Sequence, residues 1–249
     1  MLEARNIHFS YRTNMPVLQG VSVEITPGSF LAILGVNGCG KSTLLSCLTG
    51  IRKPNSGQVF LDGVELSNVS RLDRAKQIAF VSQHSHANRL TVYDSILLGR
   101  RPHMEGAPTN DDYEVVEGVI CRLGLADYAL RYASELSGGE YQKMVLARAF
   151  VQQANTLLFD EPTNNLDPAN QQDVMKEIAN EVHERGIAAA AVMHDVNLAL
   201  KYCDKFLFLK NGNVESFGDA DIVTHERMAS IYGLECEVIE HNGRRFVVA

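Results

Sequence analysis

The segment Gly35-Val36-Asn37-Gly38-Cys39-Gly40-Lys41-Ser42 constrains this chain more than any other feature. It has the G-x-x-x-x-G-K-[S/T] pattern of a loop that cradles phosphate groups. The apolar run Ser29–Leu34 precedes it and predicts a strand buried on both faces, and a helix is expected from Lys41. In this order, backbone N–H groups and a helix N-terminus surround an anion. The alternative is a glycine-rich turn with a surface lysine, and the strand–helix context weighs against it.

The loop predicts a site for ATP in which individual residues have distinct tasks. Lys41 can bridge the β- and γ-phosphates, and Ser42 can ligate magnesium. A catalytic thiol at Cys39 is conceivable at a helix N-terminus, but no histidine partner is identifiable, so we read Cys39 as a small residue that fits the loop. The predicted nucleotide-binding residues here are Gly35, Val36, Asn37, Gly38, Cys39, Gly40, Lys41, Ser42 and Thr43.

Two carboxylates follow another buried strand. The run Thr156–Phe159 is short and apolar, and Asp160 and Glu161 come directly after it. In α/β sheets, ligand chemistry lies at the carboxyl ends of the strands. Asp160 suits a magnesium contact, direct or through water, and Glu161 suits polarisation of an attacking water. The alternative is an acidic turn at a strand end, which loses weight beside a phosphate loop.

The order of elements predicts an α/β fold. Residues 1–35 are rich in β-branched and apolar runs, and strands alternate with helices again from about residue 154, which predicts a mainly parallel sheet. Between these parts, helical periodicity replaces the strand pattern, and Gly99–Asn110 is expected to be a loop. The expected helices are Val92–Leu98, Tyr113–Leu123 and Gly138–Gln153. We therefore predict one domain of residues 1–249, with a catalytic core at 1–83 and 154–219, a helical subdomain at 84–153 and a short C-terminal extension at 220–249.

Charge and hydropathy exclude several classes of protein. The 23 basic and 30 acidic residues leave a net charge of -7, so broad nucleic-acid binding is not expected. The longest apolar runs, Phe30–Val36 and Ile187–Met193, are too short to cross a bilayer, and the N-terminus shows no secretory segment. The five cysteines are scattered, as in a reducing compartment. We expect a cytoplasmic protein that reaches membranes only through partners.

A third motif gives a family resemblance over essentially the whole chain. Leu136-Ser137-Gly138-Gly139-Glu140, hereafter the signature segment, resembles the signature of ATP-binding cassette (ABC) transporter ATPase subunits and precedes the Asp160–Glu161 strand as it does in that family. The resemblance implies an ABC-ATPase core of the P-loop NTPase class: a mixed sheet, an N-terminal antiparallel β region and an inserted helical subdomain carrying the signature. The activity implied is ATP hydrolysis coupled to transport, with ATP and Mg2+ as cofactors.

Further positions match the family one by one. Tyr11 resembles the aromatic residue that stacks on adenine, and Gln83 resembles the glutamine that senses magnesium and the transmembrane partner. Asn165-Leu166-Asp167 resembles a loop that crosses the dimer interface, with Asn165 and Asp167 as its polar residues. His194 resembles the histidine that contacts the γ-phosphate. The alternatives are strand-edge packing for Tyr11, a surface amide for Gln83 and a capped strand-end histidine for His194.

The signature segment also has a local physical logic. Ser137 and Glu140 have the spacing of a capping box, which leaves the N–H groups of Gly138 and Gly139 free for an anion. The resemblance implies that this anion is the ATP of a second copy of the chain, in a head-to-tail dimer that forms two such sites by symmetry. Glu140 stands where many members of the family have glutamine, and our hypothesis is that it acts on its own helix cap.

The cargo is indicated more weakly than the activity. The segments Leu90–Arg101, Thr163–Asp167 and Met193–Ala199 resemble those of importers of metal chelates, namely ferric siderophores, haem or cobalamin. The resemblance implies integral-membrane permease subunits, indirectly a substrate-binding protein, and a peripheral position on the inner face of the cell membrane. A soluble cassette ATPase for DNA repair or iron–sulfur assembly, and an exporter subunit, remain alternatives.

Overall fold

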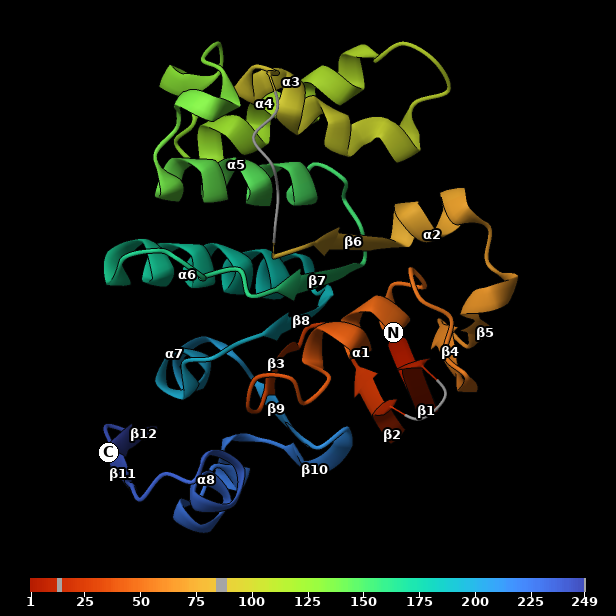
Figure 1. The fold of residues 1–249 in the computed structure, drawn as a ribbon. Coiled ribbons are helices and arrows are strands. Elements are labelled where there is room, and N and C mark those ends of the chain that lie inside the picture. Colours follow the sequence, from red (N-terminus) through yellow and green to blue (C-terminus); the bar gives the residue numbers. More distant parts are fainter. Residues whose placement is uncertain (13–14, 84–88, 249) are drawn as a thin grey trace.

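The computed structural model describes residues 1–12, 15–83 and 89–248. It contains two main sheets, a group of helices and a C-terminal helix with a hairpin (Figure 1). The predicted start of the helical subdomain at residue 84, and Ala249 at the end of the extension, lie outside the described residues. Within the described residues, no helix combines the length and the apolar character that crossing a bilayer requires.

The central sheet has six strands in the order β10-β9-β3-β8-β7-β6. Strands β3, β6, β7, β8 and β9 run parallel to one another. Strand β10 forms one edge of the sheet and pairs with β9 in an antiparallel hairpin. Every residue of β3, β7 and β8 is buried, as their continuous apolar sequences predict. The strands are β3 (Phe30–Leu34), β6 (Ile78–Val81), β7 (Thr156–Asp160), β8 (Ala188–Val192), β9 (Lys205–Lys210) and β10 (Asn213–Gly218).

A second, antiparallel sheet is built mainly from the N-terminal region. Its order is β2-β1-β4-β5, and it comprises β1 (Leu2–Arg12), β2 (Met15–Ile25), β4 (Ser56–Leu61) and β5 (Val64–Glu65). Helix α1 (Lys41–Leu48) shares one hydrophobic cluster with this sheet, because Leu44, Leu45 and Leu48 are buried together with Ile7 and Val21. The antiparallel β region predicted from the sequence is therefore confirmed, and it packs on the helix that follows the phosphate loop.

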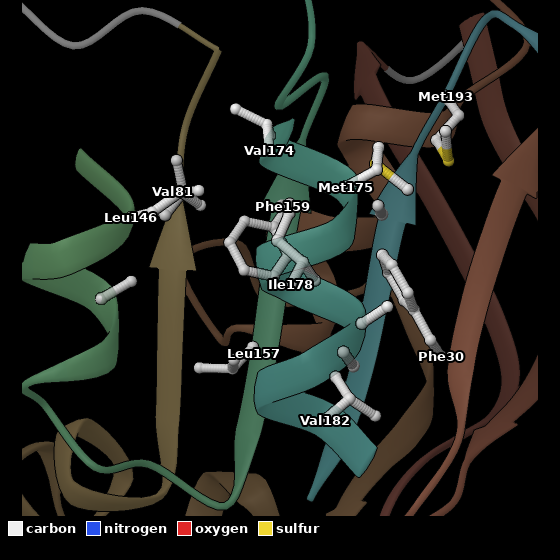
Figure 2. Packing of buried hydrophobic residues seen from close by; sticks show 14 of the residues in the cluster. Phe30, Val81, Leu146, Leu157, Phe159, Val174, Met175, Ile178, Val182 and Met193 are labelled. Carbon is white, nitrogen blue, oxygen red and sulfur yellow. The ribbon is translucent and has the colours of Figure 1, made fainter. Parts of the chain in front are cut away.

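The other face of the central sheet is covered by helices. Helix α6 (Pro168–Arg185) places Met175 and Ile178 against Phe30 and Phe159 in one continuous core (Figure 2). The helix begins at the N-cap Asp167 and ends at Gly186, whose φ of 61° suits a glycine after a helix. This packing holds β7 and the residues after it in a fixed position.

The helical group lies between β6 and β7 in the chain and forms a separate layer (Figure 1). Its helices are α3 (Val92–Leu97), α4 (Asn110–Arg122) and α5 (Gly138–Phe150), close to the predicted ranges. The loop predicted at Gly99–Asn110 is wrong in its first part, because Leu98–His103 forms a 3-10 helix. The physical reason is a buried ion pair: Arg100 Nε lies 2.9 Å from Asp112 Oδ1, and Arg100 Nη1 also donates to the Val151 carbonyl at 2.9 Å. A buried guanidinium requires such partners, and they order the segment.

The remaining elements are short. They are α2 (Arg71–Gln77), α7 (Val196–Tyr202), α8 (His225–Tyr232), β11 (Glu237–His241) and β12 (Arg244–Val248), with 3-10 turns at Leu66–Asn68, Ala126–Tyr128, Ala133–Glu135 and Ala220–Ile222. The sequence around Asn242-Gly243 predicts a hairpin at the end of the chain, and β11–β12 confirms it. The same sequence reasoning gave no helix in the C-terminal extension, whereas His225–Tyr232 forms α8.

Candidate functional site

The glycine-rich loop connects β3 to α1 and owes its shape to positive backbone angles. Gly35, Gly38 and Gly40 have φ values of 143°, 79° and 110°, a region that side chains with a Cβ rarely adopt. Gly40 is the N-cap of α1 and supplies no side-chain hydrogen bond to the helix. The first N–H groups of α1 are therefore available for an anion at the positive end of the helix dipole.

Gly35 additionally lies against the backbone of a neighbouring strand. A Cβ built on Gly35 would lie 2.2 Å from the carbonyl oxygen of Leu209 in β9. Real Cβ atoms do not approach backbone oxygen so closely, so the loop is pressed against the sheet at its first residue. The close approach fixes where the loop leaves β3.

We expect Gly35→Ala to destabilise the fold more than Gly28→Ala. Both glycines have positive φ, 143° and 73°, so alanine introduces backbone strain at each position. A Cβ at Gly28, however, would meet nothing within 4 Å. The excess loss of unfolding free energy at Gly35 should be about 1–3 kcal/mol, measured by urea denaturation without nucleotide. Equal losses for the two variants would contradict the close packing of the loop against β9.

Lys41 points back into the loop. Its side chain is buried, with 5% of the residue exposed, and Nζ donates to the carbonyl oxygens of Gly35 at 2.7 Å and Val36 at 3.0 Å. Two neutral carbonyls are weak partners for an ammonium group compared with a phosphate. Cys39 is also buried, and burial raises the pKa of its thiol against the opposing effect of Lys41. A raised pKa makes the thiol a poor nucleophile, in agreement with a space-filling role.

Ser42 and Asp160 meet although 118 residues separate them in the chain. Ser42 Oγ donates to Asp160 Oδ1 at 2.9 Å, and Asp160 ends β7 with 8% of its surface exposed. Burial raises the pKa of the Asp160 carboxyl, whereas the Ser42 hydrogen bond and the charge of Lys41 oppose that rise. A hydroxyl and a carboxylate at the mouth of a phosphate loop are the hard oxygen donors that Mg2+ prefers, with phosphate completing the set.

Glu161 is the centre of a cluster drawn from three separate segments. Its Oε1 lies 2.7 Å from His194 Nε2, and its Oε2 accepts hydrogen bonds from Gln83 Nε2 at 2.6 Å and Asn164 Nδ2 at 3.1 Å. The backbone of Glu161 has a φ of 55°, in the left-handed region. Strain of this kind in a non-glycine residue persists only where the surrounding structure holds it, and it concentrates at functional positions.

The Glu161 cluster and the phosphate loop face one cleft. The cleft has a volume of about 490 Å3, and its lining residues are Asn37, Gly38, Gln83, Glu161, Asn164 and His194. Residues predicted separately from the sequence are thus brought together around one space. Asn164 was not predicted, although its position three residues after Glu161 is a signal that could have found it.

The signature segment begins helix α5 and shows the predicted capping box. Ser137 N donates to Glu140 Oε2 at 2.8 Å, and Glu140 N donates to Ser137 Oγ at 3.4 Å. The hydrogen bond from the Ser137 backbone is the main reason that the pKa of Glu140 is lowered, with smaller contributions from the Ser137 and Tyr128 hydroxyls. The Glu140 carboxylate is therefore engaged with its own helix, as our hypothesis requires. None of residues 136–140 lines the cleft described above.

The loop after Glu161 ends in a second cap. Asp167 is the N-cap of α6, where its Oδ1 accepts hydrogen bonds from Ala169 N and Asn170 N, both at 3.0 Å. Asn165 has a φ of 60° and lies between Glu161 and this cap. Within one chain, Asp167 shapes the turn. Asn165 lines a second pocket of about 180 Å3 together with Glu161 and Gly138, outside the cleft that the phosphate loop lines.

Tyr11 presents an aromatic ring beside the phosphate loop. The residue is 56% exposed, and its hydroxyl lies 3.2 Å from Thr43 Oγ1, one turn into α1. The guanidinium carbon of Arg52 lies 4.6 Å from the ring centroid, and the Phe9 ring meets Tyr11 edge to face. These contacts hold the ring in place while much of it stays open for stacking. Arg52 was missed, because no local pattern links it to Tyr11.

The family model described as "ABC transporter" matches residues 18–164. An uncharacterised ABC transporter ATP-binding protein of Methanocaldococcus jannaschii is 42% identical over 248 residues, covering 100% of this chain and 97% of that protein. A hemin import ATP-binding protein of Bordetella pertussis is 35% identical over 261 residues, covering 100% of this chain and 99% of the relative.

Solved structures give the same fold. A metal-chelate type ABC transporter in an inward-facing conformation is similar with a TM-score of 0.84 and 30% identity, over 99% of this chain and 95% of that chain. A dimeric ATP-binding cassette in a post-hydrolysis state with ADP and phosphate is similar with a TM-score of 0.79 and 26% identity, over 88% of this chain and 98% of that chain.

Proposed function

Because this chain belongs to the ABC transporter family and is an ATP-binding ATPase of that family, we propose that it is the motor subunit of an importer of metal chelates. The observation that carries the motor function is the convergence of Glu161, Gln83 and His194 on the cleft that the phosphate loop also lines. The cargo class is supported by likeness, over the whole chain, to a hemin import ATP-binding protein and to a metal-chelate type transporter.

ATP binding rests on the loop and on Tyr11. The N–H groups of the loop and the start of α1 bind the phosphates, and Lys41 exchanges the carbonyls of Gly35 and Val36 for the stronger β- and γ-phosphate oxygens. The ring of Tyr11 stacks on the adenine. Its contacts with Thr43 and Arg52 support this role, because they orient the ring without enclosing it.

Ser42, Asp160 and Gln83 are the residues that would hold magnesium. The Ser42–Asp160 pair supports this, since a hydroxyl and a carboxylate already lie 2.9 Å apart beside the phosphate loop. When the ion is bound, negative charge on the β- and γ-phosphates is neutralised. Gln83 donates to Glu161 in this structure, so it must turn to offer its oxygen to a cation, which would couple ion binding to the Glu161 cluster.

Glu161 orients and polarises the water that attacks the γ-phosphate. Its two oxygens contact different partners, and these contacts aim the carboxylate into the cleft. His194, at 2.7 Å from Glu161, stands where it can contact the γ-phosphate and orient the carboxylate. Asn164 adds a further hydrogen bond and keeps Glu161 in its strained conformation.

The working form is a head-to-tail dimer of two copies. In each site, Ser137, Gly138 and Gly139 of one copy contact the ATP on the phosphate loop of the other, and the loop at Asn165–Asp167 crosses the interface. Two features support this. No signature residue lines the cleft that contains Asn37 and Gly38 of its own phosphate loop, since Gly138 meets Glu161 only in a second pocket without loop residues. The similar cassette with ADP and phosphate is dimeric. ATP closes the dimer and hydrolysis opens it, a two-state switch driven by contacts to the γ-phosphate.

Closure of the dimer is passed to permease subunits in the membrane. The proposed contact surface is Gln83 with the helix and turn at residues 91–101, and Gln83 also donates a hydrogen bond to Glu161 of the catalytic cluster. In this proposal the protein works on the inner face of the cell membrane, in the cytoplasm, with a substrate-binding protein as an indirect partner on the other side.

The proposed function predicts a stable complex with an integral-membrane protein. The chain should co-purify with permease subunits from its native membranes, and the complex in proteoliposomes should accumulate haem, a ferric siderophore or cobalamin only with ATP. The Glu161→Gln complex is the control and should show no uptake. Purification without any membrane protein would contradict a transport role, and ATP-driven movement in the opposite direction would contradict import.

A further inference from the structure

The C-terminal residues 220–248, hereafter the C-terminal segment, contact both loops that face the proposed γ-phosphate position. In Figure 1 they lie on the side of the central sheet where β9 and β10 form its edge, with the hairpin near α7. Lys210 of β9 donates to Ser230 of α8 at 2.9 Å. Met228 and Ile231 of α8 are buried in the main hydrophobic core, so the segment is packed in place. Its hydrogen bonds extend to two loops of the candidate site, the phosphate loop and the loop that carries His194.

The first contact is made with the phosphate loop. Tyr232, the last residue of α8, accepts a hydrogen bond on its hydroxyl from Gly35 N at 3.0 Å, across 197 residues of sequence. The carbonyl of the same Gly35 accepts the hydrogen bond from Lys41 at 2.7 Å. One residue of the loop is therefore held on its N–H side by the C-terminal segment and on its C=O side by the lysine that meets ATP.

The second contact is made with the loop that carries His194. The side-chain amide of Asn197 pairs with the backbone of Val247 in β12: Nδ2 donates to the carbonyl at 2.9 Å, and Oδ1 accepts from Val247 N at 2.8 Å. Asn197 lies in the first turn of α7, two residues after the N-cap Asp195. Paired hydrogen bonds of this kind fix both distance and orientation, so β12 holds the start of α7 and with it the position of His194.

We propose that residues 220–248 are a brace that sets the phosphate loop and the His194 loop relative to each other, with Tyr232 and Asn197 as positioning residues for ATP hydrolysis. The inference rests on the proposed function of these two loops. His194, Asn197, Tyr232 and Val247 line one cleft of about 390 Å3, so both anchors belong to a single continuous arrangement.

The chemistry of Tyr232 suits a fixed contact. Burial raises the pKa of its phenol to about 12, although the Gly35 N–H partly opposes this, so the hydroxyl stays neutral at physiological pH. Gly35 itself is buried and its N–H has Tyr232 as the acceptor. Loss of the hydroxyl would leave a buried N–H without that partner, and the loop would relax to recover one.

Tyr232→Phe should raise the KM for ATP about 3- to 10-fold, the equivalent of one hydrogen bond, with kcat within about twofold of the wild type. The reason is that the phosphate loop, which binds ATP in ground and transition states alike, loses its anchor. The measurements are steady-state ATPase kinetics and equilibrium binding of ATP.

Asn197→Ala should change the other kinetic constant. It should lower kcat by about 3- to 10-fold and leave KM within about twofold, because the His194 loop loses its hydrogen bonds to β12.

Tyr202→Phe is the matched control. The Tyr202 hydroxyl donates to Gln172 Oε1 at 2.8 Å, so the variant also loses one tyrosine hydrogen bond. The partner of this hydrogen bond lies on α6 rather than in the phosphate loop. Its KM and kcat should equal those of the wild type. The brace is contradicted if Tyr232→Phe behaves like Tyr202→Phe, or if Tyr232→Phe and Asn197→Ala lower kcat and raise KM together. An inactive wild type would instead contradict the proposed ATPase site itself.

Discussion

Glu161→Gln should abolish steady-state ATP hydrolysis and leave ATP binding intact. The carboxylate accepts hydrogen bonds from Gln83 and Asn164 on one oxygen and meets His194 with the other. An amide keeps the shape but cannot take a proton from water, and loss of a general base lowers turnover by about 100- to 10,000-fold. With ATP bound and uncleaved, two copies should remain closed, so a stable dimer should appear on size exclusion in ATP and Mg2+.

Glu215→Gln is the control for this variant. Glu215 is exposed on β10, outside the cleft of the Glu161 cluster, and carries the same chemical change. It should hydrolyse ATP as the wild type does and show no stable dimer on size exclusion in ATP and Mg2+, because hydrolysis reopens the dimer. Rapid turnover by Glu161→Gln would remove Glu161 from the role of water-orienting residue, and loss of ATP binding would show that the substitution acts on the loop instead.

Lys41→Met should weaken ATP binding by at least about 100-fold, since truncation of one partner of a buried charge pair has an effect of this size. Methionine keeps most of the aliphatic stem and removes the ammonium group, which matters because Lys41 is only 5% exposed. Without nucleotide, the variant loses the hydrogen bonds to the carbonyls of Gly35 and Val36 and the charge interaction with Asp160, and the fold should persist. Equilibrium titration with ATP and thermal unfolding measure the two properties.

Lys176→Met controls for the loss of a positive charge. Lys176 is exposed on α6, and its substitution should change neither ATP affinity nor the unfolding temperature. ATP affinity within tenfold of the wild type for Lys41→Met would contradict the proposed bridging of the β- and γ-phosphates. Unfolding of the variant would instead mean that the two carbonyl contacts carry more of the stability of the loop than we infer.

Local features of the site were predictable because they depend on residues close in sequence. The positive φ angles of the phosphate loop require glycine, and the capping box of Ser137 and Glu140 requires only their spacing. The sequence marks both ends of helix α6, since Pro168 suits the first turn of a helix and Gly186 suits the position after its end. The buried strands followed from their continuous apolar sequences.

The errors fall where distant residues decide the local structure. Leu98–His103 contains proline and glycine and reads as a loop, yet the buried pair of Arg100 with Asp112 orders it as a 3-10 helix. Helix α8 has a capping threonine and a terminal glycine, but it is only eight residues long, and its formation depends on burial of Met228 and Ile231. The contact between Arg52 and Tyr11 joins two elements that have no common pattern.

The sequence alone was enough to identify the phosphate loop and the family resemblance. The glycine motif, the helix cap and the apolar strand pattern each depend on residues that are close together in the chain. The tertiary structure decided which groups meet. Gln83 reaches Glu161 across 78 residues and Ser42 reaches Asp160 across 118, since the parallel strands bring their ends to one edge of the sheet. The contact from Tyr232 to Gly35 has no sequence signal at all, because the packing of α8 on the core creates it.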